Sequence, residues 1–245
     1  NDYINCGANP LIGEGTLSIS AWFNLADANW NLLLGDNSVQ FSVKGSTGDT
    51  RIAFYGSTDP FQAVVGTYVV GAWYNLILTF DGSLAQADRL KLYLNGDPLS
   101  NLNAGTPSTT LLPNPSPYNF LIGRGGTGSS NTLDGKMSNV QLWDATLSPE
   151  KVLTVYNNGT PTLTPPNQSD LKGSWKLDNT ATFSTNWTVP DASGNGNDGT
   201  SSGMTEQSLV NNNVSTLNGE SSGMTSGNLV LSDLTRNLPY ENYSL

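Results

Sequence analysis

Apolar and polar residues alternate with a period of two in several short stretches of the chain. In TLSISAWF, residues 16–23, the alternation sends four apolar side chains to one face of an extended strand: Leu17, Ile19, Ala21 and Phe23. The stretches WYNLILTFDG and RLKLYLNGD repeat it with Leu76, Leu78, Leu90 and Leu92, and each reaches a turn dipeptide, Asp-Gly or Asn-Gly. This pattern is typical of half-buried strands in antiparallel sheets.

Weaker alternation occurs in SVQFSVK, RIAFY, NFLIG and MSNVQLW. Residues 1–145 are therefore expected to hold about eight to ten short strands. Strands of this length joined by polar turns favour an all-β, two-sheet antiparallel sandwich. The composition agrees with this fold class, since only 12% of the residues are charged and 26 are glycine.

One short helix is predicted in LSPEKVLTVYNNG. Ser148 suits the N-cap, Pro149 the first helical position, and Gly159 can end the helix. Its apolar side chains are expected to pack on the sandwich: Val152, Leu153 and Tyr156.

The character of the chain changes after residue 160. Residues 161–169 form a connector rich in proline and threonine, and residues 170–245 contain one clear strand, LKGSWKLD, followed by long polar stretches. SSGMTEQSLV at 201–210 is echoed by SSGMTSGNLV at 221–230. We expect a sandwich core over 1–160. Residues 170–245 are expected either to complete the same sandwich in permuted order or to begin a further module.

The stretch LDGKMSNVQLWDATLSPEKVLTVYNNG resembles the closing strand and helix of laminin-G-like and pentraxin-like modules of the concanavalin A-like lectin/glucanase superfamily. LSISAWFN, WYNLILTFDG and LKLYLNGD are similar to other strands of that family, in the same order. The resemblance covers most of residues 1–160. It implies a jelly-roll sandwich with one short helix, as found in phage or extracellular structural proteins.

The resemblance also concerns the two ends of the chain. GSWKLD, DASGNGNDGT and NLPYENYSL are similar to the leader that opens such modules, yet here they stand near the C-terminus. Residues 241–245, ENYSL, are therefore expected to continue the strand that contains Tyr3 and Ile4. They would do so within their own chain or by donation to a neighbouring copy, which would build a head-to-tail assembly.

Charge and cysteine content exclude several classes of function. Ten basic and 20 acidic residues give a net charge of −10, which repels the phosphate backbone, so nucleic acid is not an expected partner. Cys6 is the single cysteine and is expected to be a buried, small apolar residue. Apolar runs fall short of the roughly 20 residues that span a bilayer, so membrane insertion is not expected.

Catalysis is not expected. The chain contains no histidine, which excludes catalytic triads and histidine metal sites. The resemblance implies that a glycosidase of this superfamily would carry its catalytic carboxylates as Glu-x-Asp-x-x-Glu. The five glutamates do not lie in that pattern: they are Glu14, Glu150, Glu206, Glu220 and Glu241.

DASGNGNDGT is the candidate metal site. Its oxygen-bearing side chains are Asp191, Asn195, Asn197 and Asp198, on a loop with several glycines. Ca²⁺ takes oxygen ligands in flexible geometry, so calcium is the ion predicted for this loop. The alternative is a turn in which the Asp and Asn side chains bond to their own backbone.

Sugar binding needs aromatic faces, planar amides and charged groups on exposed loops. The candidate ligand-binding residues are Asp36 and Asn37 in GDNS, and Arg124 and Asn131 in the loop that follows NFLIG. Trp22, Trp30 and Tyr93 are further aromatic candidates. The alternative for Trp22 and Tyr93 is that they cover the outer face of a sheet.

These features predict a non-catalytic module for glycan binding or adhesion, on a virion or an extracellular surface. The alternative is a structural protein of a capsid, fibre or filament that binds no sugar. Expected partners are glycans, neighbouring copies of the chain or other surface-protein modules.

Overall fold

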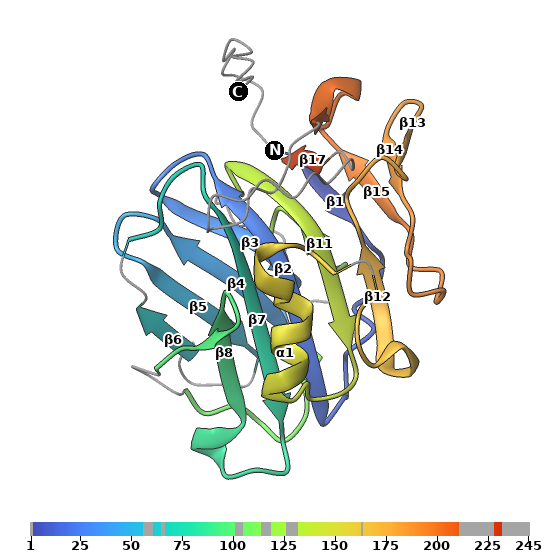
Figure 1. Ribbon diagram of the computed structural model, residues 1–245. Helices are drawn as coiled ribbons and strands as arrows, with labels where there is room; N and C mark the ends of the chain where they lie inside the picture. The colour runs from blue at the N-terminus through green and yellow to red at the C-terminus, as the bar shows by residue number, and fades with distance from the viewer. Residues whose placement is uncertain are drawn as a thin grey trace.

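The computed structural model describes residues 2–55, 61–64, 67–100, 105–113, 119–125, 132–162, 164–210 and 228–231. Within these residues two antiparallel sheets pack face to face, and one α-helix lies outside them (Figure 1). The predicted all-β, two-sheet sandwich with one short helix is confirmed.

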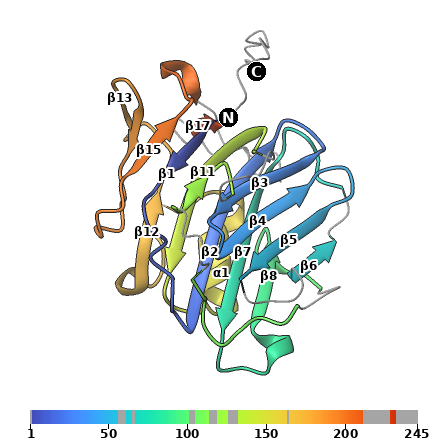
Figure 2. The same ribbon diagram turned by 180° about the vertical axis from the view of Figure 1, so that it is seen from behind.

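Sheet A has nine strands in the order β13-β14-β15-β1-β10-β3-β4-β5-β6. The strands are β13 (Thr182–Phe183), β14 (Trp187–Val189), β15 (Gly199–Ser202), β1 (Tyr3–Asn5), β10 (Leu121–Ile122), β3 (Trp30–Gly35), β4 (Val39–Lys44), β5 (Asp49–Phe54) and β6 (Phe61–Val64). Figure 2 shows this sheet from the side opposite to the helix.

Sheet B follows the order β16-β17-β11-β2-β7-β8-β9, and β12 also pairs with β11. The strands are β16 (Leu209–Val210), β17 (Asn228–Leu231), β11 (Gly135–Trp143), β2 (Thr16–Leu25), β7 (Trp73–Asp81), β8 (Leu90–Leu94), β9 (Asp97–Pro98) and β12 (Leu171–Trp175). Four single 3₁₀ turns join elements of the chain: Gln86–Asp88, Asn157–Gly159, Gln168–Asp170 and Glu206–Ser208.

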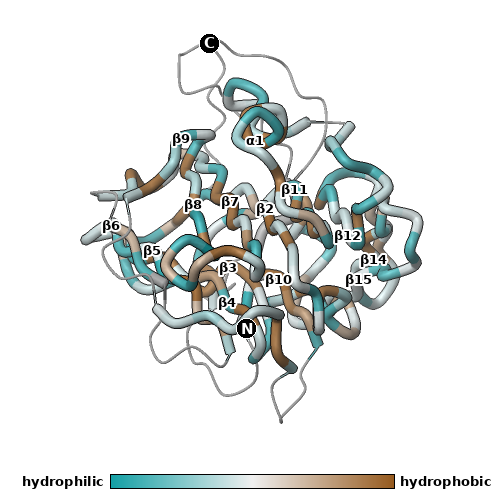
Figure 3. Tube along the Cα trace, turned by 90° about the horizontal axis from the view of Figure 1, so that it is seen from below, coloured by the Kyte–Doolittle hydropathy of each residue, from teal (hydrophilic) through white to brown (hydrophobic). Residues whose placement is uncertain are grey.

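The main core lies between the two sheets, where the strands carry hydrophobic positions (Figure 3). The predicted inward residues are all at most 2% exposed: Leu17, Ile19, Phe23, Leu76, Leu78, Leu90 and Leu92. Cys6 is also buried in this core, as predicted. The alternation of period two therefore identifies the buried face of each long strand.

The helix α1 (Pro149–Tyr156) covers the outer face of sheet B. Val152 and Val155 are buried, whereas Leu153 is 55% exposed, so the prediction that Leu153 packs inward is wrong. Leu153 lies about 100° around the helix from Val152. Its Cδ2 lies beside Gly96, in the turn between β8 and β9, and the side chain stays largely open to solvent. The helix ends at Asn157, in left-handed conformation, two residues before the predicted glycine.

Tyr156 reaches the sheet as expected and stacks on Trp22 with ring centroids 5.8 Å apart. With Trp73 these rings form a small apolar cluster of their own beside the helix. Within the described residues no helix is long and apolar enough to cross a membrane.

The strand β1 lies between β10 and β15, so the N-terminal strand pairs with residues almost 200 positions later in the chain. On the other sheet, β12 pairs with β11, and Trp175 at its end is fully buried against Phe120. Residues 171–202 thus contribute strands to both sheets. The predicted domain boundaries near 160 and 170 stay predictions, and the predicted strand continuation by residues 241–245 lies outside the described residues.

The C-terminal ends of the two similar stretches, 201–210 and 221–230, pair with each other in the structure. β16, from the first copy, pairs with β17, from the second copy, and the equivalent residues Leu209 and Leu229 are backbone partners in this ladder. β17 also pairs with β11 at Gly135 and Lys136. The second copy therefore extends sheet B, while residues 221–227 lie outside the described part.

Candidate functional site

Three of the four predicted ligand-binding residues lie in the described part of the chain, near the outer face of sheet A. Asp36 and Asn37 form the turn between β3 and β4, and Arg124 follows β10, the neighbour of β3. Asn131 lies outside the described residues. The fold thus brings two separate sequence segments to one region of the sheet.

The outer face of sheet A carries an aromatic ring stacked on a guanidinium group. Trp30 begins β3 and Arg51 lies on β5, two strands away, with its Cζ 4.3 Å from the centroid of the Trp30 ring. Ser42, on the strand between them, is directly opposite both Leu32 and Arg51 in the ladder. The pairing of three strands therefore builds one platform from residues far apart in sequence.

A hollow of about 270 Å³ adjoins this stack, and we call it the Trp30 hollow. Its lining residues are Trp30, Asn31, Leu32, Ser42 and Arg51. The Asn31 amide accepts from Asp134 N at 2.8 Å and donates to Asp27, which anchors this end of β3. Nε of Arg51 is buried and has no hydrogen-bond partner in the described part of the chain. The hollow thus combines a ring, a hydroxyl group and a cation.

A second group of polar side chains continues from the hollow toward β1. Gln40 lies on β4, and its amide donates to Asn37 Oδ1 at 3.4 Å. Gly125 lets this amide approach, because a Cβ there would lie 3.1 Å from both Gln40 Nε2 and Leu32 Cδ1. Gln40 therefore links the Trp30 hollow to the two predicted residues Asn37 and Arg124.

Arg124 ends this row beside the N-terminal strand. Its Cζ lies 5.4 Å from the centroid of the Tyr3 ring, and its Nε is buried without a hydrogen-bond partner among the described residues. Arginine over an aromatic ring thus occurs at both ends of the row. Each stack presents a flat surface with hydrogen-bond donors at its edge.

Asp36 has a different environment from its neighbour Asn37. Its Oδ1 accepts from the backbone N–H groups of Ser38 and Val39 at 2.8 and 2.9 Å, and its Oδ2 accepts from Asn9 at 3.2 Å. The side chain is buried, and this burial raises the pKa of Asp36 above its usual value. Asp36 holds the turn that presents Asn37, and a direct role in binding stays a prediction.

The predicted metal residues lie together in one loop that is hydrogen-bonded to β12. The Asp191 carboxylate accepts four hydrogen bonds, from Ser174 N, Ser193 N, Ser193 Oγ and Asn197 N. The amides of Asn195 and Asn197 donate to the carbonyl oxygens of Leu171 and Lys172, and Asp198 Oδ1 accepts from Asp191 N.

Each of these four side chains thus bonds to the backbone. In the part of the chain that the structure describes, no group of three or more acidic, cysteine or histidine side chains is placed to hold a metal ion. The backbone-bonded turn describes the observed contacts, and calcium stays a prediction for this loop.

Two of the three aromatic candidates are covered by other parts of the chain and are therefore closed to a ligand. Trp22 and Tyr93 are 2% and 5% exposed, because α1 and the segment before it cover that face of sheet B. Trp30 is half-buried, on the opposite sheet. Of the three aromatic candidates, Trp30 is therefore the one that is partly exposed.

Sequence reasoning missed Arg51, Gln40 and Ser42. Part of the signal was present in the sequence. The alternation in SVQFSVK and RIAFY places Gln40, Ser42 and Arg51 on the outer face of their strands, away from the buried Phe41 and Ile52. The order of strands in sheet A was needed to show that they are neighbours.

A family model described as the concanavalin A-like lectin/glucanases superfamily matches residues 1–153. No curated protein matches the chain. Among solved structures, a Bacteroides ovatus protein titled a "putative carbohydrate binding protein" has a TM-score of 0.64 and 20% sequence identity. The match covers 84% of this chain and 57% of that one.

A heptameric SAP-like pentraxin from Limulus polyphemus has a TM-score of 0.46 and 17% identity, over 64% of this chain and 82% of that one. A Trypanosoma rangeli sialidase mutant has a TM-score of 0.41 and 15% identity, over 58% of this chain and 22% of that one. At these identities the likeness to solved structures concerns the fold alone.

Proposed function

Because the chain belongs to the concanavalin A-like lectin/glucanases superfamily, we propose that it is a non-catalytic glycan-binding module. The site that we assign to this function is the Trp30 hollow with the row of polar groups that leads from it to Arg124. The observation that carries the assignment is the Trp30–Arg51 stack, which joins β3 and β5 of sheet A.

The chemistry of the row suits a sugar. The C–H face of a sugar ring packs on flat aromatic and guanidinium surfaces, while its hydroxyl groups need hydrogen-bond partners around the edge. Ser42 and Gln40 offer a hydroxyl and an amide, and Arg51 offers donors that have no acidic partner in the lining of the hollow. A glycan chain could extend across several strands, from Trp30 toward Tyr3.

Two observations favour binding without catalysis. The lining of the Trp30 hollow contains no carboxylate, whereas a glycosidase needs a pair of them beside the scissile bond. The chain also contains no histidine to act as a general base. Glycan capture on an extracellular or virion surface is the wider role included in the proposal.

Binding to a glycan array, followed by titration calorimetry with the best ligand, tests the proposal. We expect Trp30→Ala and Arg51→Ala each to weaken binding by about tenfold or more, as for central residues of a small interface. Lys91→Ala is the matched control, since it removes the same charge from an exposed position on β8, in the other sheet. Circular dichroism should show that all three variants stay folded.

Equal affinity in Trp30→Ala, Arg51→Ala and the parent would place the site elsewhere. If the array shows no binding and the protein copurifies in an ordered particle, the structural role is correct and glycan binding is not.

A further inference from the structure

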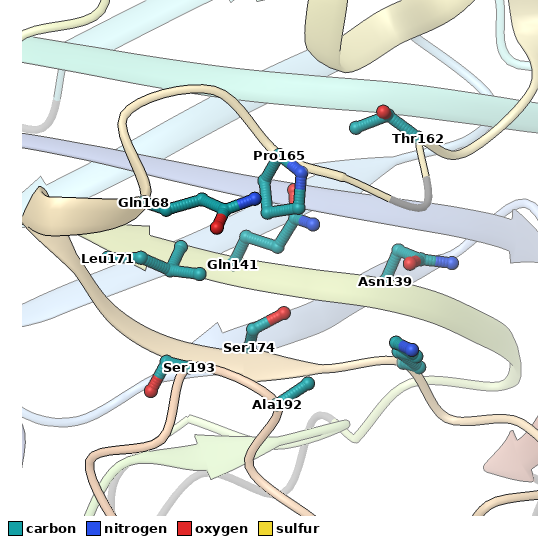
Figure 4. Close-up of a pocket in the computed structure, with 10 residues that line it drawn as sticks. Asn139, Gln141, Thr162, Pro165, Gln168, Leu171, Ser174, Ala192 and Ser193 are labelled. Atoms are coloured by element: carbon teal, nitrogen blue, oxygen red, sulfur yellow. The ribbon is translucent and has the colours of Figure 1, made fainter.

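A second cavity, of about 220 Å³, lies on the outer face of sheet B, where β12 pairs with β11. Figure 4 shows it between these two strands, the connector around Pro165 and the loop at Ala192 and Ser193. We call it the β11–β12 cavity. It belongs to the other sheet from the Trp30 hollow and shares no lining residue with it.

Two buried polar side chains form the floor of this cavity. Gln141 and Ser174 are directly opposite each other in the β11–β12 ladder, and each is 3% exposed. Their chain neighbours Val140, Leu142 and Trp175 face the main core, so the alternation turns Gln141 and Ser174 outward. Figure 4 shows both side chains directed into the cavity.

Neither side chain makes a hydrogen bond through its own polar atoms in the part of the chain that the structure describes, although Ser174 N donates to Asp191. Neither group belongs to the fully enclosed polar atoms that lack a partner, so both stay open to the cavity, where water or a ligand can supply their hydrogen bonds. Two such groups directly opposite each other in one ladder therefore offer a pair of hydrogen-bonding positions to a molecule in the cavity.

The walls hold these groups in place. Trp143 Nε1 donates to Pro166 O at 2.9 Å and fixes the connector over β11. Ala192 N donates to Ser174 O at 2.7 Å, and Asn195 Nδ2 donates to Leu171 O at 2.7 Å. The Asp191 loop therefore fixes one wall of the cavity, and a ligand would meet a preformed site.

The lining also restricts the chemistry of the ligand. Asn139, Gln168 and Ser193 add neutral polar groups, Lys176 adds the one charge, and there is no acidic or aromatic side chain. A cation would find no counter-charge, and a flat aromatic ligand would find no ring to stack on. Hydroxyl groups fit, since each can donate to an amide oxygen and accept from an amide N–H or serine hydroxyl.

We propose that the β11–β12 cavity is a separate binding site for one hydroxylated ring of the size of a single sugar residue, held by the Gln141 amide and the Ser174 hydroxyl. The proposal stands on the contacts of sheet B, so it does not depend on the Trp30 hollow.

Nuclear magnetic resonance of ¹⁵N-labelled protein, titrated with methyl α-D-glucoside, methyl β-D-galactoside and methyl α-D-mannoside, tests this site. At least one glycoside should cause saturable shifts of the Gln141 side-chain amide and of the backbone N–H groups of Ser174 and Ser193. Gln141→Leu and Ser174→Ala should each weaken this binding by about tenfold or more.

The stability of the variants separates a binding role from a structural one. Gln141→Leu keeps the volume of the side chain and removes an amide without a partner, so its melting temperature should equal or exceed that of the parent. Arg51→Ala, in the other sheet, should leave the shifts at Gln141 unchanged even if it abolishes binding at the Trp30 hollow.

Two results would overturn the proposal. If none of the three glycosides produces saturable shifts, the cavity holds water only. If the shifts at Ser174 and Ser193 persist unchanged in both Gln141→Leu and Ser174→Ala, the glycoside binds elsewhere.

Discussion

At the scale of single residues, hydrogen-bond partners distinguish a structural polar group from one available to a ligand. Asp36 and Gln141 are about equally buried, at 4% and 3% exposure. Asp36 accepts two hydrogen bonds from its own turn and one from Asn9, whereas the Gln141 amide faces a cavity without a partner among the described residues. The same burial thus accompanies a turn-forming role in one case and a candidate binding role in the other.

Asp36 should make stability depend on pH in a characteristic direction. Burial raises its pKa in the folded state above the reference value of 3.8, so the native protein holds the proton more tightly than the unfolded chain. This contribution to stability is complete below pH 3.8 and is lost as the pH rises through the raised pKa. Urea unfolding of the parent and Asp36→Asn, from acid to neutral pH, measures it.

We expect the free energy of unfolding of the parent, minus that of Asp36→Asn, to fall as the pH rises. A difference that stays constant or grows with pH would contradict burial as the dominant influence on the Asp36 carboxyl.

At the scale of elements, side-chain bonds to the backbone fix the loops that shape both sites. The Asp191–Asp198 loop binds the backbone of β12 at three points, through Asp191, Asn195 and Asn197. Its glycines Gly194 and Gly196 take positive φ angles, which a residue with a side chain adopts at a cost. The loop therefore shapes the β11–β12 cavity through the strand it holds.

Asp191→Ala should lower the free energy of unfolding by about 1–3 kcal/mol, because four donors lose their acceptor. Asp198→Ala is the graded control and should cost less, since the Asp198 carboxylate accepts from one donor, Asp191 N, among the described residues. Thermal unfolding in chelator and in calcium measures both effects.

The predicted calcium site adds a second expectation to the same experiment. If calcium binds the loop, it should raise the melting temperature of the parent and leave that of Asp191→Ala unchanged. An equal response of both proteins to calcium would remove the loop as a calcium site.

At the scale of the whole molecule, the two sheets combine strands from distant parts of the chain. β1 has β10 on one side and β15 on the other, and β11 pairs with β2, β12 and β17. Strands with unpaired edges promote association between chains, so these pairings protect the sandwich as well as complete it.

A chain that ends at residue 160 should therefore be much less stable than the full chain and should aggregate. It would lose the partners β15 and β12, and with them the fully buried Trp175, whose removal alone should cost about 3–5 kcal/mol. Thermal unfolding and size-exclusion chromatography test this expectation. A monomeric 1–160 chain with unchanged stability would show that residues 171–202 are dispensable for the fold.

Deletion of residues 236–245 tests the role expected for the tail. Completion of its own sandwich predicts a lower melting temperature, and donation to a neighbouring copy predicts loss of a multimer in light scattering. If the shortened protein is equally stable and equally associated, neither role is correct.

Local patterns predicted the elements well because alternation and caps act over a few residues. Leu17, Ile19 and Phe23 face the core as their spacing requires, and Pro149 begins the helix. Leu153 was assigned to the wrong side because apolar character alone does not fix the face of a short helix. Of the candidate site, Arg124 and Asn37 were predicted, whereas Arg51 and Gln40 required the strand order.

The sequence by itself determined the fold class, the buried face of each long strand, the position of the helix and the absence of histidine chemistry, because each follows from residue type and spacing. Only the tertiary structure decided that Arg51 stacks on Trp30, that Gln141 faces Ser174, and that β1 pairs with β15. These contacts join residues separated by 20 or more positions, and strand pairing over such distances depends on the packing of the whole sandwich rather than on local pattern.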